Sequence, residues 1–294
     1  MAKIGLKNFL FGILTEAPDG TATYGVATKP AKAQKSNAPG IKNASLVILA
    51  CMVVTFCLFF FWFGDASHFQ DANPDGHPID IWGTIYKGGI IVPILQGLFL
   101  TVIVLCVERF FALNSAKGKG DVTKFVANIK AALLKNDIAG AQELCKKQGG
   151  SVAAVVAAAL VRYDEMDKNT ALSKEQKITT IQKELEEATA LEMPALQQNL
   201  PIVATMTTLG TLVGLLGTVI GMIKSFQALS ASGAPDSTEL SAGISEALIN
   251  TAFGIATGAF AVIGYNFYTN KIDHLTYAID EIGFSIVQTF AATH

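Results

Sequence analysis

The chain has 294 residues, of which 51% are hydrophobic and only 16% are charged. Soluble domains carry about 25% charged residues, so this composition indicates an integral membrane protein. The formal net charge of -2 gives no electrostatic reason to expect a nucleic acid partner. The four cysteines contain no CxxC pair and join no histidine cluster, so we expect no metal site and no cofactor.

The first 43 residues are predicted to form a cytoplasmic N-terminal tail. Ile4 to Leu14 could form a short interfacial helix. Thr15 to Asn43 is rich in Gly, Pro, Ala, Ser and Lys, which is typical of a flexible segment. The uncharged run 44–63 that follows is long enough for a first transmembrane helix. A signal peptide is the alternative, but its apolar core would have only about 7–15 residues.

Three more stretches are apolar enough to cross a bilayer, which needs about 20 residues of helix. They are residues 88–107, 200–224 and 246–268. Lysines and arginines lie before the first span and after the second. The loops 64–87 and 225–245 contain acidic residues. No Lys or Arg lies within Gly64 to Tyr86 or between the last two spans. The positive-inside rule therefore predicts periplasmic loops and a cytoplasmic location for both termini. Residues 269–294 are expected to form a C-terminal cytoplasmic helix.

The segment 108–199 has helical periodicity and is predicted to be a cytoplasmic helical domain. Gly149-Gly150 should end one helix. Ser173, with Gln176 three residues later, fits a capping box that begins a long amphipathic helix. We expect this helix to continue into the third span, with Pro194 and Pro201 as positions of kinks. The fold class is thus all-α: four transmembrane helices with long cytoplasmic helical extensions.

The last two spans each carry a face of small and polar residues. Thr207, Thr211 and Thr218 share one face of the third span. Glu246 and Asn250 share a face of the fourth, with Thr251 on a neighbouring face. Small residues allow close helix packing and hydroxyls can bond between helices, which is the simplest explanation. The glycines expected to pack helices are Gly210, Gly214, Gly217, Gly221, Gly254 and Gly258.

Polar groups at membrane depth also tend to face a watery pathway. Neither span has an acid or base at its centre. A proton pathway needs a titratable group, so a conducting assembly would need a carboxylate from another polypeptide. The residues predicted to line such a pathway are Thr218, Thr251, Glu246, Asn250, Thr211 and Thr207.

The run GLLGTVIGMIKSF, residues 214–226, resembles the signature of the MotA/TolQ/ExbB proton channel family. The resemblance continues through residues 243–272 and covers roughly residues 92–288. The sequence resembles ExbB and TolQ more than it resembles MotA. In ExbB-like proteins the hydroxyls at the positions of Thr218 and Thr251 line the pore, and Glu246 matches a polar residue near the outer end of the last span. Three departures are Gly210–Val213 where the family has Ala-Pro-Leu-Leu, Asn250 where it has a small residue, and an extra N-terminal span.

The resemblance implies a subunit of the bacterial inner membrane that assembles with itself, usually as a pentamer. The ring would surround an ExbD-like single-span partner carrying a protonatable Asp, and would drive a TonB-like protein that energises outer-membrane transport. Alternatives within the family are a TolQ-like role in envelope maintenance and a flagellar or gliding stator.

Two further classes are a structural membrane scaffold and a small-solute transporter, although the sequence has no inverted repeat or pair of broken helices. An enzyme is not expected, since no nucleophile lies near a base and no phosphate-binding loop is present.

Overall fold

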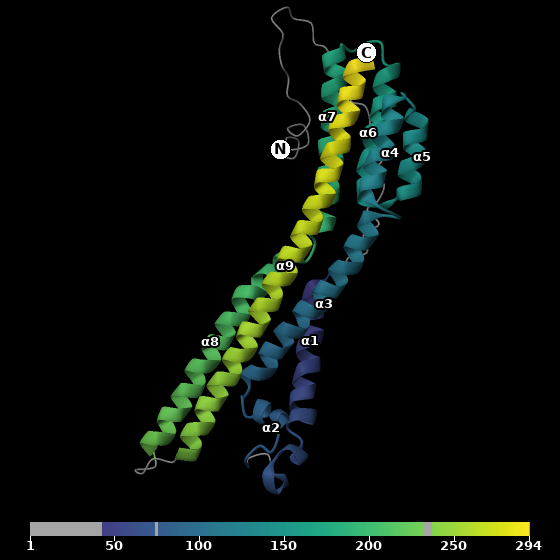
Figure 1. Ribbon diagram of the computed structural model, residues 1–294. Helices are drawn as coiled ribbons and strands as arrows, with labels where there is room; N and C mark the ends of the chain where they lie inside the picture. Colours follow the sequence, from purple (N-terminus) through teal and green to yellow (C-terminus); the bar gives the residue numbers. More distant parts are fainter. Residues whose placement is uncertain (1–42, 74–75, 232–236, 294) are drawn as a thin grey trace, which may run out of the picture. The chain divides into compact units, whose positions relative to one another are not determined.

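The computed structural model describes residues 43–73, 76–231 and 237–293, which belong to one compact unit (Figure 1). The predicted interfacial helix 4–14 and nearly all of the N-terminal tail lie outside this described part. The described helices are α1 Ala44–Leu58, α2 Ile81–Tyr86, α3 Ile91–Lys117, α4 Val122–Leu134, α5 Ile138–Gln148, α6 Gly150–Lys168, α7 Lys174–Gln197, α8 Leu200–Ala231 and α9 Ser237–Thr293. The described residues contain no β-strand, which confirms the all-α prediction.

Within the described ranges, four helical stretches are long and apolar enough to cross a membrane, as the sequence predicted. The first is α1 with the π-helical turn Phe59–Phe63, and the others lie in α3, α8 and α9. Helix α1 packs on α3, where Thr55 Oγ1 lies 3.0 Å from the carbonyl oxygens of both Cys51 and Pro93. Helices α8 and α9 continue beyond the predicted spans, and α9 runs unbroken through to residue 293.

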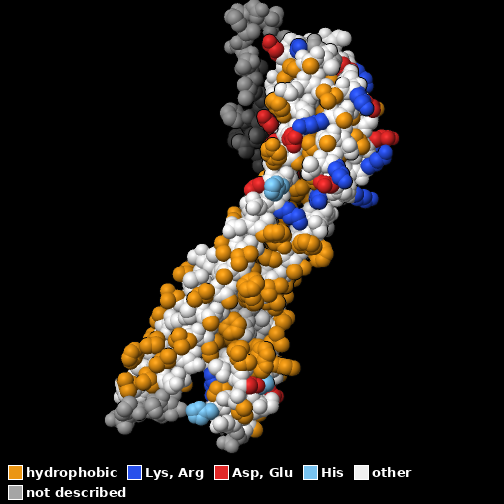
Figure 2. Space-filling view, in the orientation of Figure 1, with side chains coloured by type: hydrophobic (Ala, Val, Ile, Leu, Met, Phe, Trp, Pro, Cys, Tyr) orange, Lys and Arg blue, Asp and Glu red, His pale blue; other side chains and the backbone are white. Residues whose placement is uncertain are grey.

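The helices α4 to α7 pack with the C-terminal half of α9 around an apolar core. Its most buried members include Ile129, Val156, Leu160 and Ile279. Figure 2 shows charged side chains gathered over this region and hydrophobic side chains covering the apolar parts of α1, α3, α8 and α9. A helical bundle with a charged surface is therefore continuous with the apolar helices.

Two local predictions in this bundle are confirmed. Helix α5 ends at Gln148, and Gly149 and Gly150 have φ values of 62° and 80° that favour glycine. The run that begins at Val122 nevertheless forms two helices, α4 and α5, which are separated at Asn136 with its φ of 54°. At the start of α7, the Ser173 hydroxyl accepts from the Gln176 backbone N–H at 3.3 Å, and the Gln176 side chain accepts from the Ser173 N–H at 3.0 Å. This is the expected capping box.

The prediction that α7 continues into the third span was wrong. The chain breaks at Gln198–Asn199, where Asn199 has a φ of 64°, and α8 begins at Leu200. Pro201 lies in the first turn of α8, where a missing backbone N–H removes no helical bond. Pro194 lies in the last turn of α7, so neither proline marks the break.

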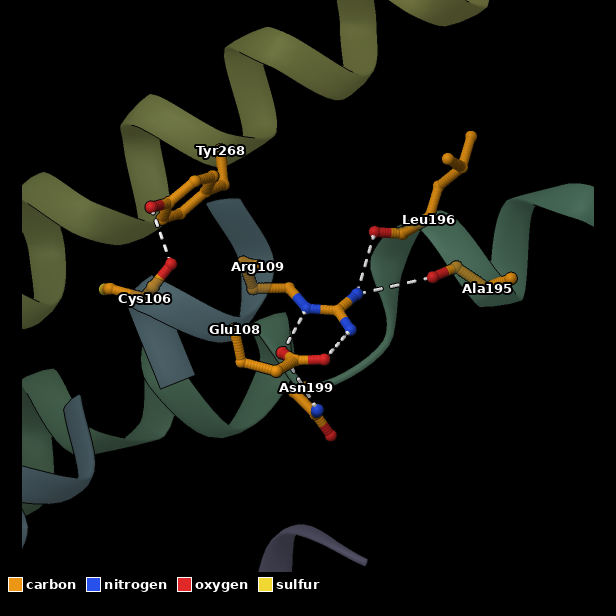
Figure 3. Close-up of polar contacts among 7 residues, drawn as sticks. All are labelled: Cys106, Glu108, Arg109, Ala195, Leu196, Asn199 and Tyr268. Carbon is orange, nitrogen blue, oxygen red and sulfur yellow. Dashed lines mark hydrogen bonds and ion pairs between the residues drawn. The ribbon is translucent and has the colours of Figure 1, made fainter. Parts of the chain in front are cut away.

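A buried arginine from α3 holds this break in place (Figure 3). Arg109 is 0% exposed, and its Nη1 donates to the carbonyls of Ala195 at 3.3 Å and Leu196 at 3.4 Å. Its guanidinium also forms an ion pair with Glu108, which accepts from Asn199 Nδ2 at 3.3 Å. Arg109 thereby satisfies carbonyls that the end of α7 leaves unpaired.

Candidate functional site

Helices α8 and α9 lie side by side with their backbones in close contact (Figure 1). A Cβ built on Gly254 would lie only 2.8 Å from the Cα of Gly214, and one built on Gly221 would lie 2.9 Å from the backbone nitrogen of Ala247. The structure places all six glycines predicted for packing on this contact, which we call the glycine seam. Its members are Gly210, Gly214, Gly217, Gly221, Gly254 and Gly258.

Helix α3 packs along one side of the α8–α9 pair. Val213 of α8 packs against a cluster that contains Leu98 and Leu105 of α3, and Phe253 of α9 packs against a cluster that contains Val92 of α3. At about 100° per residue, Thr218 lies roughly 140° around α8 from Val213, and Thr251 roughly 200° around α9 from Phe253. These threonines therefore lie on the side of the seam away from α3.

We call this surface the threonine face, and it contains Thr207, Thr211, Thr218 and Thr251. All four are partly or fully exposed in the single chain. Three of their hydroxyls donate to carbonyls of their own helix: Thr211 to Thr207 at 3.1 Å, Thr218 to Leu215 at 2.6 Å, and Thr251 to Ala247 at 3.1 Å. Each of these oxygens keeps acceptor lone pairs, so the face can bind a donor without carrying charge.

Glu246 and Asn250 lie elsewhere, in a buried polar cluster that joins α8 and α9 to the turn before α3. Lys224 Nζ lies 2.7 and 3.0 Å from the two carboxylate oxygens of Glu246, which is 7% exposed. Asn250, 0% exposed, donates through Nδ2 to the Gly88 carbonyl at 3.0 Å. Gly89 has a φ of 77°, and a Cβ there would collide with the Glu246 carboxylate. We call Lys224, Glu246, Asn250, Gly88 and Gly89 the polar clamp.

The structure thus divides the six residues predicted to line a pathway into two groups. The four threonines lie on an open face, whereas Glu246 and Asn250 are buried against the start of α3. Sequence reasoning missed the pairing of Lys224 with Glu246. Its signal was available, because the two opposite charges lie at the same outer ends of two antiparallel spans.

One buried polar atom of the polar clamp has an unsatisfied hydrogen-bonding capacity. The Oδ1 atom of Asn250 is buried and has no hydrogen-bond partner among the described residues. Buried polar atoms are usually satisfied by protein or by ordered water. The described part of the chain holds no group of three or more His, Cys, Asp or Glu side chains that could bind a metal ion.

The helices that carry these features lie in a part of the chain that is similar to known proteins. Residues 151–281 match the model of the MotA/TolQ/ExbB proton channel family. A Synechocystis sp. protein named ExbB-like 3 is 37% identical over 93 residues, which are 30% of this chain and 44% of that protein. The biopolymer transport protein ExbB of Pseudomonas putida is 28% identical over 202 residues, covering 67% of this chain and 59% of the relative.

The Tol-Pal system protein TolQ of Haemophilus influenzae is 37% identical over 75 residues, covering 26% of this chain and 33% of the relative. In each of these three relatives the match spans less than two thirds of the relative's length. The resemblance found in the sequence is confirmed for residues 151–281, which include α8 and the part of α9 that forms the glycine seam.

Proposed function

We propose that the chain, whose residues 151–281 match the model of the MotA/TolQ/ExbB proton channel family, is the stator subunit of a motor driven by the proton-motive force. It is a multi-pass protein of the bacterial inner membrane, with four apolar helices. Several copies, in this proposal five, form a ring whose inner wall is the threonine face. Both termini and the helical bundle lie in the cytoplasm.

The threonine face is the observation that carries the proposal. The glycine seam fixes α8 and α9 so closely that their hydroxyls are not used to join them: Thr218 and Thr251 bond within their own helices. A hydroxyl bonded only within its own helix takes no part in joining α8 to α9 and keeps acceptor lone pairs for another partner. A face of uncharged acceptors suits an axis along which a foreign carboxylate gains and loses protons.

That carboxylate comes from an ExbD-like single-span partner enclosed by the ring. Neither α8 nor α9 has an acid or base at the middle of its apolar stretch, so this chain supplies the wall and the partner supplies the titrating group. Movement of the partner is passed to a TonB-like protein, which energises outer-membrane transport. The relative named ExbB supports this assignment.

The test replaces Thr218 and Thr251 by valine, which keeps the shape of the side chain but removes the hydroxyl. We expect the double variant to assemble normally with a co-expressed ExbD-like subunit and to lose at least about tenfold in proton flux, the equivalent of about 1.4 kcal/mol from one lost hydrogen bond. Thr205→Val is the matched control, because Thr205 is an exposed α8 threonine that also bonds within its helix. Equal flux in both variants would remove the threonine face from the pathway.

A TolQ-like role in envelope maintenance is the second candidate, supported by TolQ relatives of two species at 36–37% identity. The same residues would act on a TolR-like partner in this role. Affinity purification from the native membrane separates the two, since recovery of an ExbD-like or a TolR-like protein decides which partner the ring encloses.

A further inference from the structure

A groove outside the proposed pathway lies between α3 and α9. It has a volume of about 390 Å³, which is within the range of small-ligand sites. Its lining from α3 includes Cys106, Val107, Phe110 and Phe111, and its lining from α9 includes Phe260 and Tyr268. The Tyr268 hydroxyl donates to the Cys106 carbonyl at 2.6 Å, so the most polar atom of the lining is already occupied (Figure 3). The groove is therefore apolar.

A cation lies at one end of this groove. Lys271 Nζ lies 5.2 Å from the ring centroid of Phe110 and 6.0 Å from that of Phe267. Its only hydrogen bond among the described residues is a long one, 3.4 Å to Asn114 Oδ1. A lysine ammonium has three donors, so two remain for a ligand. Lys271 is also the first charged residue of α9 after Glu246.

The distance along α9 from Phe260, which lines the groove, to Lys271 matches the thickness of one leaflet of a bilayer. Phe260 and Lys271 are eleven residues apart on α9, which is about 16 Å along the helix axis. Half of a hydrocarbon core of about 30 Å is about 15 Å. An acyl chain in the groove would thus place its headgroup phosphate beside Lys271.

We propose that the α3–α9 groove is a binding site for an anionic glycerophospholipid, with one acyl chain against the aromatic side chains and the phosphate on Lys271. Charge decides between the possible occupants. A second protein copy would bury the two free ammonium donors against an apolar helix, which is costly without a partner. A phosphate oxygen accepts from them in a charge-assisted hydrogen bond. Phosphatidylglycerol is the simplest probe of this chemistry.

The experiment titrates phosphatidylglycerol and phosphatidylcholine onto the purified full-length protein in detergent and counts bound lipids by native mass spectrometry. We expect about fivefold tighter binding of phosphatidylglycerol, which is the effect of one lysine at a membrane surface. Lys271→Met should bring the ratio to within twofold of unity, and Lys271→Arg should restore it. Lys119→Met, which removes an exposed lysine away from the groove, should leave it unchanged.

A second pair of variants tests the groove itself. Val107 lines it and is 51% exposed, so Val107→Trp should fill it and weaken both lipids at least about fivefold, through lost burial of acyl chain. Ile263→Trp is the control, since Ile263 is 66% exposed on α9 and does not line the groove. A lipid ratio unaffected by Lys271→Met, or lipid binding unaffected by Val107→Trp, would overturn the proposal.

Discussion

Replacing Lys224 by methionine removes the positive charge of the polar clamp and leaves the Glu246 carboxylate without its partner. The cost depends on how far the pair is removed from water. Loss of one member of a buried pair costs about 3–5 kcal/mol, whereas an exposed pair contributes about 0.2–1 kcal/mol. The Glu246 side chain is 9% exposed and that of Lys224 is 53% exposed. We therefore expect a loss of about 1–3 kcal/mol, between these two limits.

The assay is thermal unfolding of the purified protein in detergent, followed by tryptophan fluorescence. For a chain of this size the expected loss lowers the apparent Tm by about 3–10 °C. The variant with both charges exchanged, Lys224→Glu with Glu246→Lys, should recover more than half of that shift. Proton flux with the proposed partner, a co-expressed ExbD-like subunit, measured on the same variants, reports whether Glu246 also moves protons.

The two readouts separate a clamp from a relay. If Glu246 only pairs with Lys224 to join α9 to α8, the exchanged variant regains flux together with stability. If Glu246 carries protons, the exchanged variant regains stability and remains blocked. An unchanged Tm in Lys224→Met, or no recovery in the exchanged variant, would refute the clamp.

Four further outcomes are expected. Gly254→Leu should lower stability by about 1–3 kcal/mol in the same unfolding assay, because its Cβ would meet the Gly214 backbone, and a neutral effect would contradict the seam. Arg109→Met should cost about 3–5 kcal/mol and reduce the yield of folded protein, since it removes a fully buried charge from Glu108. Burial raises the pKa of Cys145 to about 12, so maleimide labelling at pH 8 should be on the order of 10³-fold slower in the native than in the unfolded chain; fast native labelling would disprove this. The Gly83 N–H and His68 hold the pKa of Asp80 below its usual 3.8. This contact therefore stabilises the folded loop above pH 3.8, and the stabilisation is lost as the pH falls through the lower pKa of the folded state. Protease resistance of loop 64–87 that persists at pH 2 would contradict this prediction.

The spans could be predicted from the sequence because burial in lipid demands about 20 apolar residues, and that requirement is local. The glycine spacing of α8 and α9 also reports a local geometry, one face of a helix. The break at Asn199 was harder to predict from the sequence. It depends on Arg109, which is distant in the sequence and supplies the donors that allow α7 to end there.

The candidate site shows the same division. Periodicity places Thr218 on the polar face of its span, whereas Thr251 lies on a neighbouring face of the last span and was assigned to the pathway by the family resemblance. Glu246 and Asn250 were assigned to the same pathway because they also share a face of α9. Which side of that helix meets α3 is a tertiary fact, and it directs these two residues towards Lys224 and Gly88 instead.

Helix α9 is one continuous helix that extends from the outer end of the last span into the helical bundle. Its 57 residues contain no proline and extend about 86 Å at 1.5 Å per residue. Over that length, a tilt of about 2° at the outer end moves the far tip by about 3 Å. In the proposed ring, a displacement at the outer end of α9 would thus be enlarged at its other end, where α9 packs with helices α4 to α7.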